Sequence, residues 1–298
     1  MLDSSWLWAL FTLLAAAAQT VRNAMQRELT ASLGTVGATH VRFLFGFPFA
    51  LVFLAGILFV SGAALPRPGL AFVPWVIDGA LAQIAATALM LAAMGERSFV
   101  VTIAYIKTEP VQVALFGLIF LGDAVTLPMM IAILIATAGV VVMSLKGGAT
   151  GGLKPTLLGL AAGGMFALSA IGYRGAILSL GENDFVMRAT FTLAVGLVLQ
   201  AAILTLYLAV RDRAVLGAIM RAWRPSLFAG FMGATASQFW FLAFALATAA
   251  SVRTLALVEV LFAQAISAFV FGQKTSAREM VGIVMIVAGV ALLIWAHG

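Results

Sequence analysis

The sequence predicts an all-α polytopic membrane protein with ten transmembrane helices arranged as two inverted five-helix repeats. Three observations lead to this fold class. Of the 298 residues, 63% are hydrophobic and 9% are charged, whereas soluble domains average about 45–50% apolar and about 25% charged residues. The apolar residues form ten runs long enough to cross a bilayer. Landmark residues of the first half recur in the second half 150 positions later.

Short breaks that are polar or contain Gly or Pro separate the predicted spans. The spans are residues 4–21, 36–60, 72–94, 98–121, 125–145, 155–178, 185–210, 225–247, 252–271 and 277–296. Because each spanning helix needs about 20 residues, these spans and their connections leave no length for a soluble domain. Residues 131–143 do not alternate apolar and polar side chains, so helices are favoured over β-barrel strands.

The first apolar run begins at Trp6 and resembles the core of a signal peptide. Asp3 precedes it and no Lys or Arg does, unlike the basic start of a secretory signal, so we expect a retained first helix. The chain has no Cys and two His, and we therefore expect no disulfide, metal site or cofactor. The net charge of +6 comes from single or loop-clustered basic residues, which indicates a lipid bilayer and not nucleic acid as the partner.

Basic residues are distributed unevenly between the two ends of the predicted bundle. The end formed by loops 1–2, 3–4, 5–6, 7–8 and 9–10 carries eleven of them, Arg22 included. The end with both termini carries four, which are Arg67, Arg174, Arg188 and Arg253. The positive-inside rule then predicts that both termini lie outside the cytoplasm, with the protein in a bacterial-type inner membrane.

The internal repeat aligns residues 1–148 with residues 149–298. The aligned landmarks are Glu109 with Glu259, Gly122 with Gly272, and Gly139 with Gly289. A shift of 146 also aligns Arg42 with Arg188. Copies with an odd number of spans cross the membrane in opposite senses, and such inverted repeats are typical of secondary transporters, whose substrate site lies near the midplane. A duplication in a channel, receptor or membrane enzyme is the alternative.

The residues around these landmarks form a recognisable pattern. Ile106-Lys107-Thr108-Glu109-Pro110 lies within span four, Leu121-Gly122-Asp123 closes it, and Ala138-Gly139-Val140 follows in the next span. The second half has Leu257-Val258-Glu259-Val260 and Phe271-Gly272-Gln273, with Val260 in place of the proline. This pattern resembles the drug/metabolite transporter superfamily, specifically its EamA-type ten-helix exporters and, among them, YddG-like amino-acid exporters. The resemblance implies export of small metabolites without ATP hydrolysis. It also implies that both termini lie in the cytoplasm, which differs from the orientation that the distribution of basic residues predicts.

Ionisable residues deep in a span are costly unless they are paired or line a wet cavity. The candidates are Lys107, Glu109, Arg253 and Glu259. At 1.5 Å per residue, Glu109 lies about 16 Å into span four and Glu259 about 10 Å into span nine. The two carboxylates either meet a substrate amine or a coupling proton, or pair with Lys107 and Arg253 as part of the scaffold. Pro110 removes a backbone donor, which predicts a hinge or a packing kink in span four.

Polar and aromatic residues inside the spans predict the wall of a central cavity. They are Gln19, His40, Arg42, Gln83, Thr87, Met90, Tyr105, Thr108, Ser169, Tyr173, Ser237, Gln238, Trp240 and Gln264. Gln83 and Thr87 are four residues apart and share one helix face. Interhelical hydrogen bonding is the alternative role for each of these residues. A cavity of this composition would suit an amphipathic amino acid.

No phosphate-binding loop, His-Glu-x-x-His or Gly-x-Ser-x-Gly motif occurs in the sequence. We therefore expect no enzymatic activity and no ATP-driven pumping. The expected function is export of small metabolites by secondary transport, foremost of amino acids including aromatic ones, by alternating access through a central cavity in a monomer. The alternatives are a multidrug exporter of hydrophobic cations and a channel or non-transporting receptor. Proton coupling and the direction of flux stay open.

Overall fold

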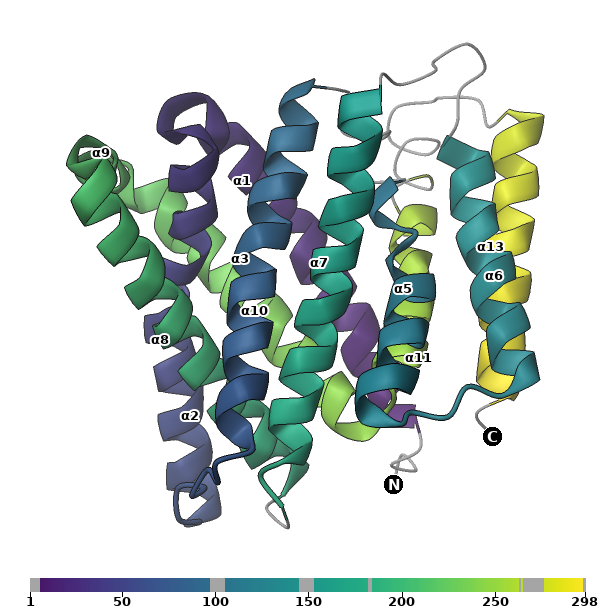
Figure 1. Ribbon diagram of the computed structural model, residues 1–298, viewed down its shortest axis with the longest axis horizontal. Coiled ribbons are helices and arrows are strands. Elements are labelled where there is room, and N and C mark those ends of the chain that lie inside the picture. Colours follow the sequence, from purple (N-terminus) through teal and green to yellow (C-terminus); the bar gives the residue numbers. More distant parts are fainter. Residues whose placement is uncertain are drawn as a thin grey trace.

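A computed structural model describes residues 6–96, 105–144, 153–181, 184–262, 264 and 276–296. These residues form helices and no strand (Figure 1). Six helices are long and apolar enough to cross a membrane: Leu7–Ser61, Phe72–Gly95, Thr156–Leu178, Phe185–Arg211, Trp223–Leu246 and Ala277–Trp295. The shorter apolar helices are Glu109–Leu121 and Leu127–Met143. This all-helical architecture is compatible with an integral membrane protein.

The helices follow one another with short connections. They are α1 (Leu7–Leu44), α2 (Phe47–Ser61), α3 (Phe72–Glu96), α5 (Glu109–Phe116), α6 (Leu127–Ser144), α7 (Leu153–Leu178), α8 (Phe185–Arg211), α9 (Arg213–Arg221), α10 (Trp223–Leu246), α11 (Ala249–Leu255) and α13 (Ala277–Trp295). A π-helical turn η2 (Gly117–Leu121) extends α5, and a 3₁₀ turn η3 (Ala256–Val258) follows α11. Apart from the first, the predicted spans agree with these helices to within a few residues wherever the chain is described. Gly272, the start of span four and the end of span nine lie outside the described residues.

The predicted end of the first span at residue 21 is wrong, because α1 continues as a helix and reverses at Gly34. Gly34 has φ 67° and ψ 175°, which separates two helical segments within α1. Across this turn the side-chain amide of Gln26 donates to the carbonyl of Ala38 at 3.0 Å. The polar stretch predicted as a loop instead turns its buried side chains, Arg22 and Gln26 among them, into the bundle. Arg22 is therefore not a loop residue, contrary to the charge count.

Gly34→Ala is expected to destabilise the protein by about 1–3 kcal/mol, because only glycine readily adopts this backbone conformation. Thermal unfolding of the detergent-solubilised protein measures the change. Gly56→Ala is the matched control, since a Cβ at Gly56 meets no atom within 4 Å and alanine favours a helix. Equal unfolding temperatures for Gly34→Ala and the wild type would show that alanine adopts the backbone conformation of this turn without strain.

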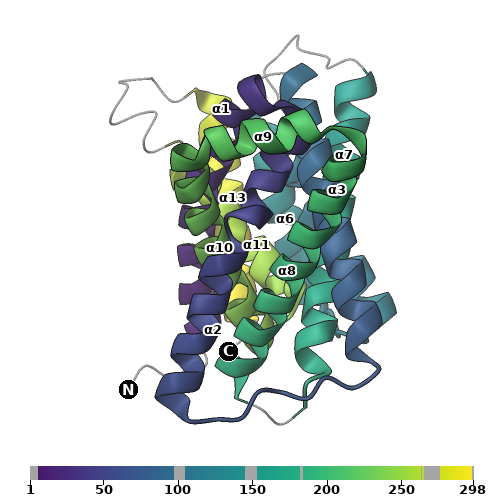
Figure 2. The ribbon, with the colours of Figure 1, turned by 90° about the vertical axis from the view of Figure 1, so that its left-hand side faces the viewer.

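Close helix pairs build the bundle, and small residues allow their approach (Figures 1 and 2). The most extensive pairings join α3 with α7, α1 with α10, and α6 with α13. A Cβ at Gly172 of α7 would lie 2.5 Å from the backbone nitrogen of Gly79 in α3. A Cβ at Gly139 of α6 would lie 2.8 Å from the carbonyl oxygen of Gly282 in α13. Larger side chains at these positions would separate the helices.

Both landmark glutamates follow an interruption of regular α-helix. Lys107 and Thr108 form a turn, and α5 begins at Glu109 with Pro110 in its first turn. A proline is tolerated there because the first turn of a helix lacks acceptors for its N–H groups. Glu259 follows the 3₁₀ turn η3 directly. Because α5 contacts α11, the two interrupted segments lie against each other inside the bundle.

The start of α1 and the end of α13 lie at the same end of the bundle (Figure 1). The short helix α9 lies across the opposite end, where it connects α8 to α10 (Figure 2). Asp212 caps α9 by accepting a hydrogen bond from the backbone N–H of Val215.

Candidate functional site

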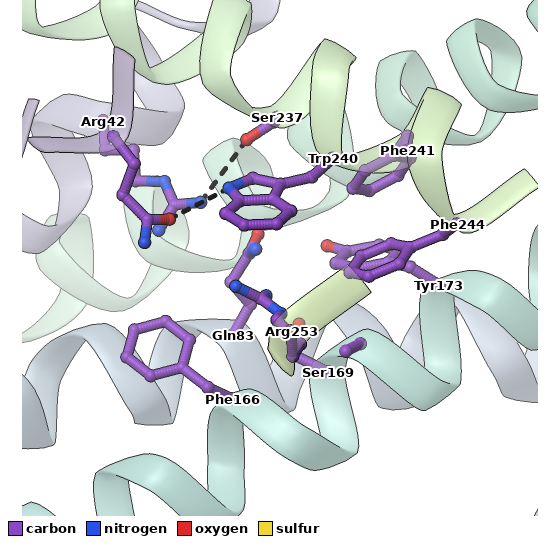
Figure 3. Close-up of a pocket in the computed structure, with 12 residues that line it drawn as sticks. Arg42, Gln83, Phe166, Ser169, Tyr173, Ser237, Trp240, Phe241, Phe244 and Arg253 are labelled. Carbon is purple, nitrogen blue, oxygen red and sulfur yellow. Dashed lines mark hydrogen bonds between the residues drawn. The ribbon is translucent and has the colours of Figure 1, made fainter. Parts of the chain in front are cut away.

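Two narrow cavities lie next to each other inside the bundle and share Gln19, Phe166 and Arg253 in their walls. The aromatic cavity is lined by Gln19, Arg42, Gln83, Phe166, Ser169, Ala170, Tyr173, Ser237, Trp240, Phe241, Phe244 and Arg253 (Figure 3). The charged cavity is lined by Gln19, Arg22, Asn23, Met90, Ile106, Lys107, Glu109, Phe166, Arg253 and Glu259. The space between atoms in them, including the parts open to solvent, is about 300 and 320 Å³. Both are so constricted that each has room for about one water molecule.

The apolar wall of the aromatic cavity comes mainly from α10 and α7. Tyr173 packs on Phe241 with ring centroids 4.5 Å apart, and Trp240 stacks on Phe244 at 6.1 Å. The indole N–H of Trp240 donates to the side-chain oxygen of Gln19 at 3.0 Å. This bond fixes the indole plane at the boundary of the two cavities. Aromatic rings held in this way present broad apolar surface together with a few polar contacts.

Arg42 reaches the aromatic cavity from the second segment of α1. Its guanidinium donates to the hydroxyls of Thr87 in α3 at 3.2 Å and Ser237 in α10 at 3.4 Å. Thr87 in turn donates to the carbonyl of Gln83, which orients its oxygen toward Arg42. The arginine is 2% exposed. Among the described residues, its hydrogen-bond acceptors are thus neutral hydroxyl oxygens.

Two ion pairs cross between the interrupted segments beside the charged cavity. Lys107 pairs with Glu259, and Arg253 pairs with Glu109 at 3.0 Å between Nε and Oε1. The Arg253 guanidinium also lies over the Trp240 ring, 4.3 Å from its centroid. Each landmark carboxylate therefore has a cationic partner from the other interrupted segment. The Arg253 side chain links this paired cluster to the aromatic wall.

Arg22 is a further buried cation in the charged cavity. It is 1% exposed, and its Nε and Nη2 donate to the side-chain oxygen of Asn23 at 3.2 and 2.6 Å. Its stem lies beside that of Arg42 over Gly233, where a Cβ would be 3.4 Å from Arg22 Cδ and 3.3 Å from Arg42 Cγ. Sequence reasoning missed Arg22 because it assigned the surrounding polar run to a loop. The signal was the 4-3-4 spacing of Arg22, Gln26, Leu29 and Leu33, which places them on one helical face.

The walls of the two cavities carry an excess of positive charge. They contain four cationic side chains, Arg22, Arg42, Lys107 and Arg253, against two carboxylates, Glu109 and Glu259. The excess is two positive charges. Charges interact strongly where water is excluded, so this excess sets the electrostatic preference of the site.

Twelve of the residues predicted for the site line one or both cavities. They are Gln19, Arg42, Gln83, Ser169, Tyr173, Ser237 and Trp240 in the aromatic cavity, Met90 in the charged cavity, and the ion-paired Lys107, Glu109, Arg253 and Glu259 beside them. Thr87 lies behind the wall and holds Arg42. The wall residues that sequence reasoning did not name are Arg22, Asn23, Ile106, Phe166, Ala170, Phe241 and Phe244. Apolar residues of this kind occur throughout the spans, so only packing distinguishes the ones that face the cavity.

Other predicted wall residues lie away from both cavities. His40 bonds through its ring Nε2 to the Thr205 hydroxyl at 3.0 Å, and Gln238 donates to Thr190 at 2.7 Å. Thr108 donates to the carbonyl of Tyr105 at 2.8 Å. Tyr105 packs against Gly159 of α7, and Gln264 is partly exposed. His40 and Gln238 thus make the interhelical hydrogen bonds that were the alternative reading for polar residues in spans.

Arg174, counted above among the four basic residues at the end with both termini, is buried at one end of the bundle. It pairs with Asp123 at 3.1 Å and donates to the carbonyls of Phe244 and Ala247 at 2.6 Å. These bonds tie α7 to the segment after η2 and to the end of α10. The arginine is therefore part of the packing and not a topological signal.

No family model matches the chain, and no curated protein matches it. Among solved structures, 28 chains match. One of them, described only as the crystal structure of a protein, aligns over 97% of this chain and 97% of its own length, with a TM-score of 0.69 and 15% identity. At this level of identity the similarity shows a shared fold. The class that fold and cavities define is a helical, membrane-type bundle with a buried, positively charged interior site.

Proposed function

We propose that the protein is a secondary transporter that moves small metabolites, foremost amino acids, through its central cavities by alternating access between two inverted five-helix repeats. The reciprocal pairing of the landmark glutamates carries this proposal. Glu109 of the first half pairs with Arg253 of the second half, and Glu259 of the second half pairs with Lys107 of the first. The cavities thus lie where the two halves meet, as in transporters built from inverted repeats.

Equivalent packing in the two halves supports the repeat. A shift of 150 residues brings α3 onto α10 and α7 onto the first segment of α1, so the pairing of α3 with α7 becomes that of α10 with α1. The same shift brings Thr87 onto Ser237, and both hydroxyls accept a hydrogen bond from Arg42. Arg42 accordingly bridges two positions that the proposed repeat makes equivalent.

Interrupted helices support a transport role further. In transporters of this plan, broken helices near the midplane form the site and supply polar backbone groups. Here the segment entering α5 and the segment leaving α11 are the interrupted ones, and both border the charged cavity. The division of α1 at Gly34 into two helical segments supports the proposed number of ten crossings.

The cavity composition favours a small amphipathic solute over a hydrophobic cation. Aromatic rings would contact an apolar side chain, and Gln19, Gln83 and Ser169 would contact polar groups. A cation exporter needs free carboxylates, yet Glu109 and Glu259 are paired and the walls carry excess positive charge. In a bacterial-type inner membrane, the basic end around α9 would face the cytoplasm and both termini the outside.

Reconstitution into liposomes tests the proposal. We expect saturable uptake and counterflow of radiolabelled amino acids such as phenylalanine, with and without a pH gradient, and no such uptake by protein-free liposomes. Conductance without saturation would instead indicate a channel. Saturable uptake of cationic dyes with none of amino acids would identify a cation exporter.

A further inference from the structure

We propose that Arg22 and Arg42 together bind an anionic group, a carboxylate or phosphate, of the transported solute. This assignment rests on the proposed transport function and specifies the chemical class of the substrate. Arg22 faces the charged cavity and Arg42 the aromatic one, and their side chains lie together over Gly233. The anionic group would lie where the two adjoining cavities meet, within reach of both guanidinium groups, with the rest of the solute toward Trp240 and Phe244.

The first reason is that neither arginine forms an ion pair with a carboxylate among the described residues. Within the described chain, the ion pairs inside the bundle join Lys107 with Glu259, Arg253 with Glu109 and Arg174 with Asp123. In the part of the chain that the structure describes, Arg22 and Arg42 donate hydrogen bonds to neutral side-chain oxygens. An arginine stays protonated in proteins, and an uncompensated buried charge is costly. A bound anion would remove this cost.

The second reason is that donors remain unused on both guanidinium groups. Arg22 Nη1 and Arg42 Nε are buried and have no hydrogen-bond partner in the structure. Planar guanidinium forks match carboxylate and phosphate oxygens, often with two bonds at once. The existing bonds to Asn23, Thr87 and Ser237 hold each fork in position without neutralising it. The site is therefore built for an acceptor that carries its own negative charge.

The third reason is that the other two cationic side chains of the cavity walls already form ion pairs. Lys107 and Arg253 are neutralised by the two glutamates, so the excess of two positive charges resides on Arg22 and Arg42. The glutamates would repel a solute anion that lay beside them. This repulsion favours placement at Gly233, where Arg22 and Arg42 adjoin.

Binding to the purified, detergent-solubilised protein tests the assignment without requiring transport. The probes are matched pairs with one phenyl group: phenylalanine with phenylalaninamide, and 3-phenylpropionate with 3-phenylpropanamide, together with phenyl phosphate and chloride. Titration calorimetry is expected to show that each amide binds at least about tenfold more weakly than its acid, as loss of a charge-assisted hydrogen bond implies. Equal binding within both pairs would overturn the proposal. Chloride binding as tight as that of the organic anions would do so as well.

Variants locate the site. Arg22→Gln and Arg42→Gln are each expected to weaken binding of the acids by about tenfold or more, with little change for the amides. Arg27→Gln, an exposed position on the same helix, is the control and should bind like the wild type. If both buried variants keep wild-type affinity, the anion lies elsewhere. Anion binding without saturable uptake into liposomes would contradict the proposed transport function and support the anion site. Equal uptake of acids and amides would contradict the anion site and support the transport function.

Discussion

Glu109→Gln is expected to destabilise the protein by about 3–5 kcal/mol, because it leaves the Arg253 charge buried without its carboxylate. Arg253 lies among α5, α11 and the aromatic wall, where Glu109 is its acidic partner at 3.0 Å. Thermal and denaturant unfolding in detergent measure the loss. In liposomes the same variant should lose most of its amino-acid uptake, since the ion pair of Glu109 with Arg253 joins the interrupted segments of the two halves.

A double-mutant cycle separates the ion pair from other effects of the substitution. Glu109→Gln with Arg253→Gln removes both charges, and this double variant is expected to recover much of the stability lost by either single change. Lys107→Met with Glu259→Gln tests the reciprocal pair in the same way. Glu28→Gln, at an exposed position of α1, is the control. If Glu109→Gln unfolds at the same temperature as this control, the pair does not contribute to stability.

Gly139→Leu is expected to cost about 3 kcal/mol or more, through overpacking of the α6–α13 interface. A Cβ at Gly139 would lie 2.8 Å from the Gly282 carbonyl oxygen, and one at Gly289 would lie 2.8 Å from that of Ala132. Backbone atoms cannot move aside as a flexible side chain can. The two helices would therefore separate and lose packing along their whole contact.

Gly56→Leu is the matched control for this prediction, because a Cβ at Gly56 meets no atom within 4 Å. Thermal unfolding of both variants in the same detergent compares them. Unfolding of Gly139→Leu at the temperature of the control would mean that the helices of this pair are free to move apart. Gly289→Leu is expected to behave like Gly139→Leu, since the two glycines occupy equivalent positions in the proposed repeat.

The helical segments were largely predictable from the sequence, and the main error was at the first of them. Apolar runs bounded by Gly, Pro and charged residues correspond to helices, because an apolar helix begins and ends where the chain can be solvated. The polar segment around Arg22 and Gln26 is an exception, because it is helical although its composition predicts a loop. Its polar side chains are stabilised by one another and by backbone groups across the turn at Gly34, so the helix continues through them.

The candidate site was predictable in its residue types but not in its pairings. Lys107, Glu109, Arg253 and Glu259 stood out because charges inside spans are rare. Which of these residues pair with one another was not predictable, since each ion pair joins segments far apart in the chain. His40 and Gln238 looked like wall residues by the same criterion, yet they bond to α8 and lie away from the cavities.

By itself, the sequence determined that this chain forms apolar helices and that Lys107, Glu109, Arg253 and Glu259 lie inside them, because both properties depend on local composition and spacing. Only the tertiary structure decided how those charges are matched. The packing of α5 against α11 neutralises Lys107 and Arg253, while the turn at Gly34 brings Arg42 back beside Arg22. The positive character of the cavities is thus a property of three-dimensional proximity: it arises because two of the four buried cations have carboxylates within reach and the other two do not.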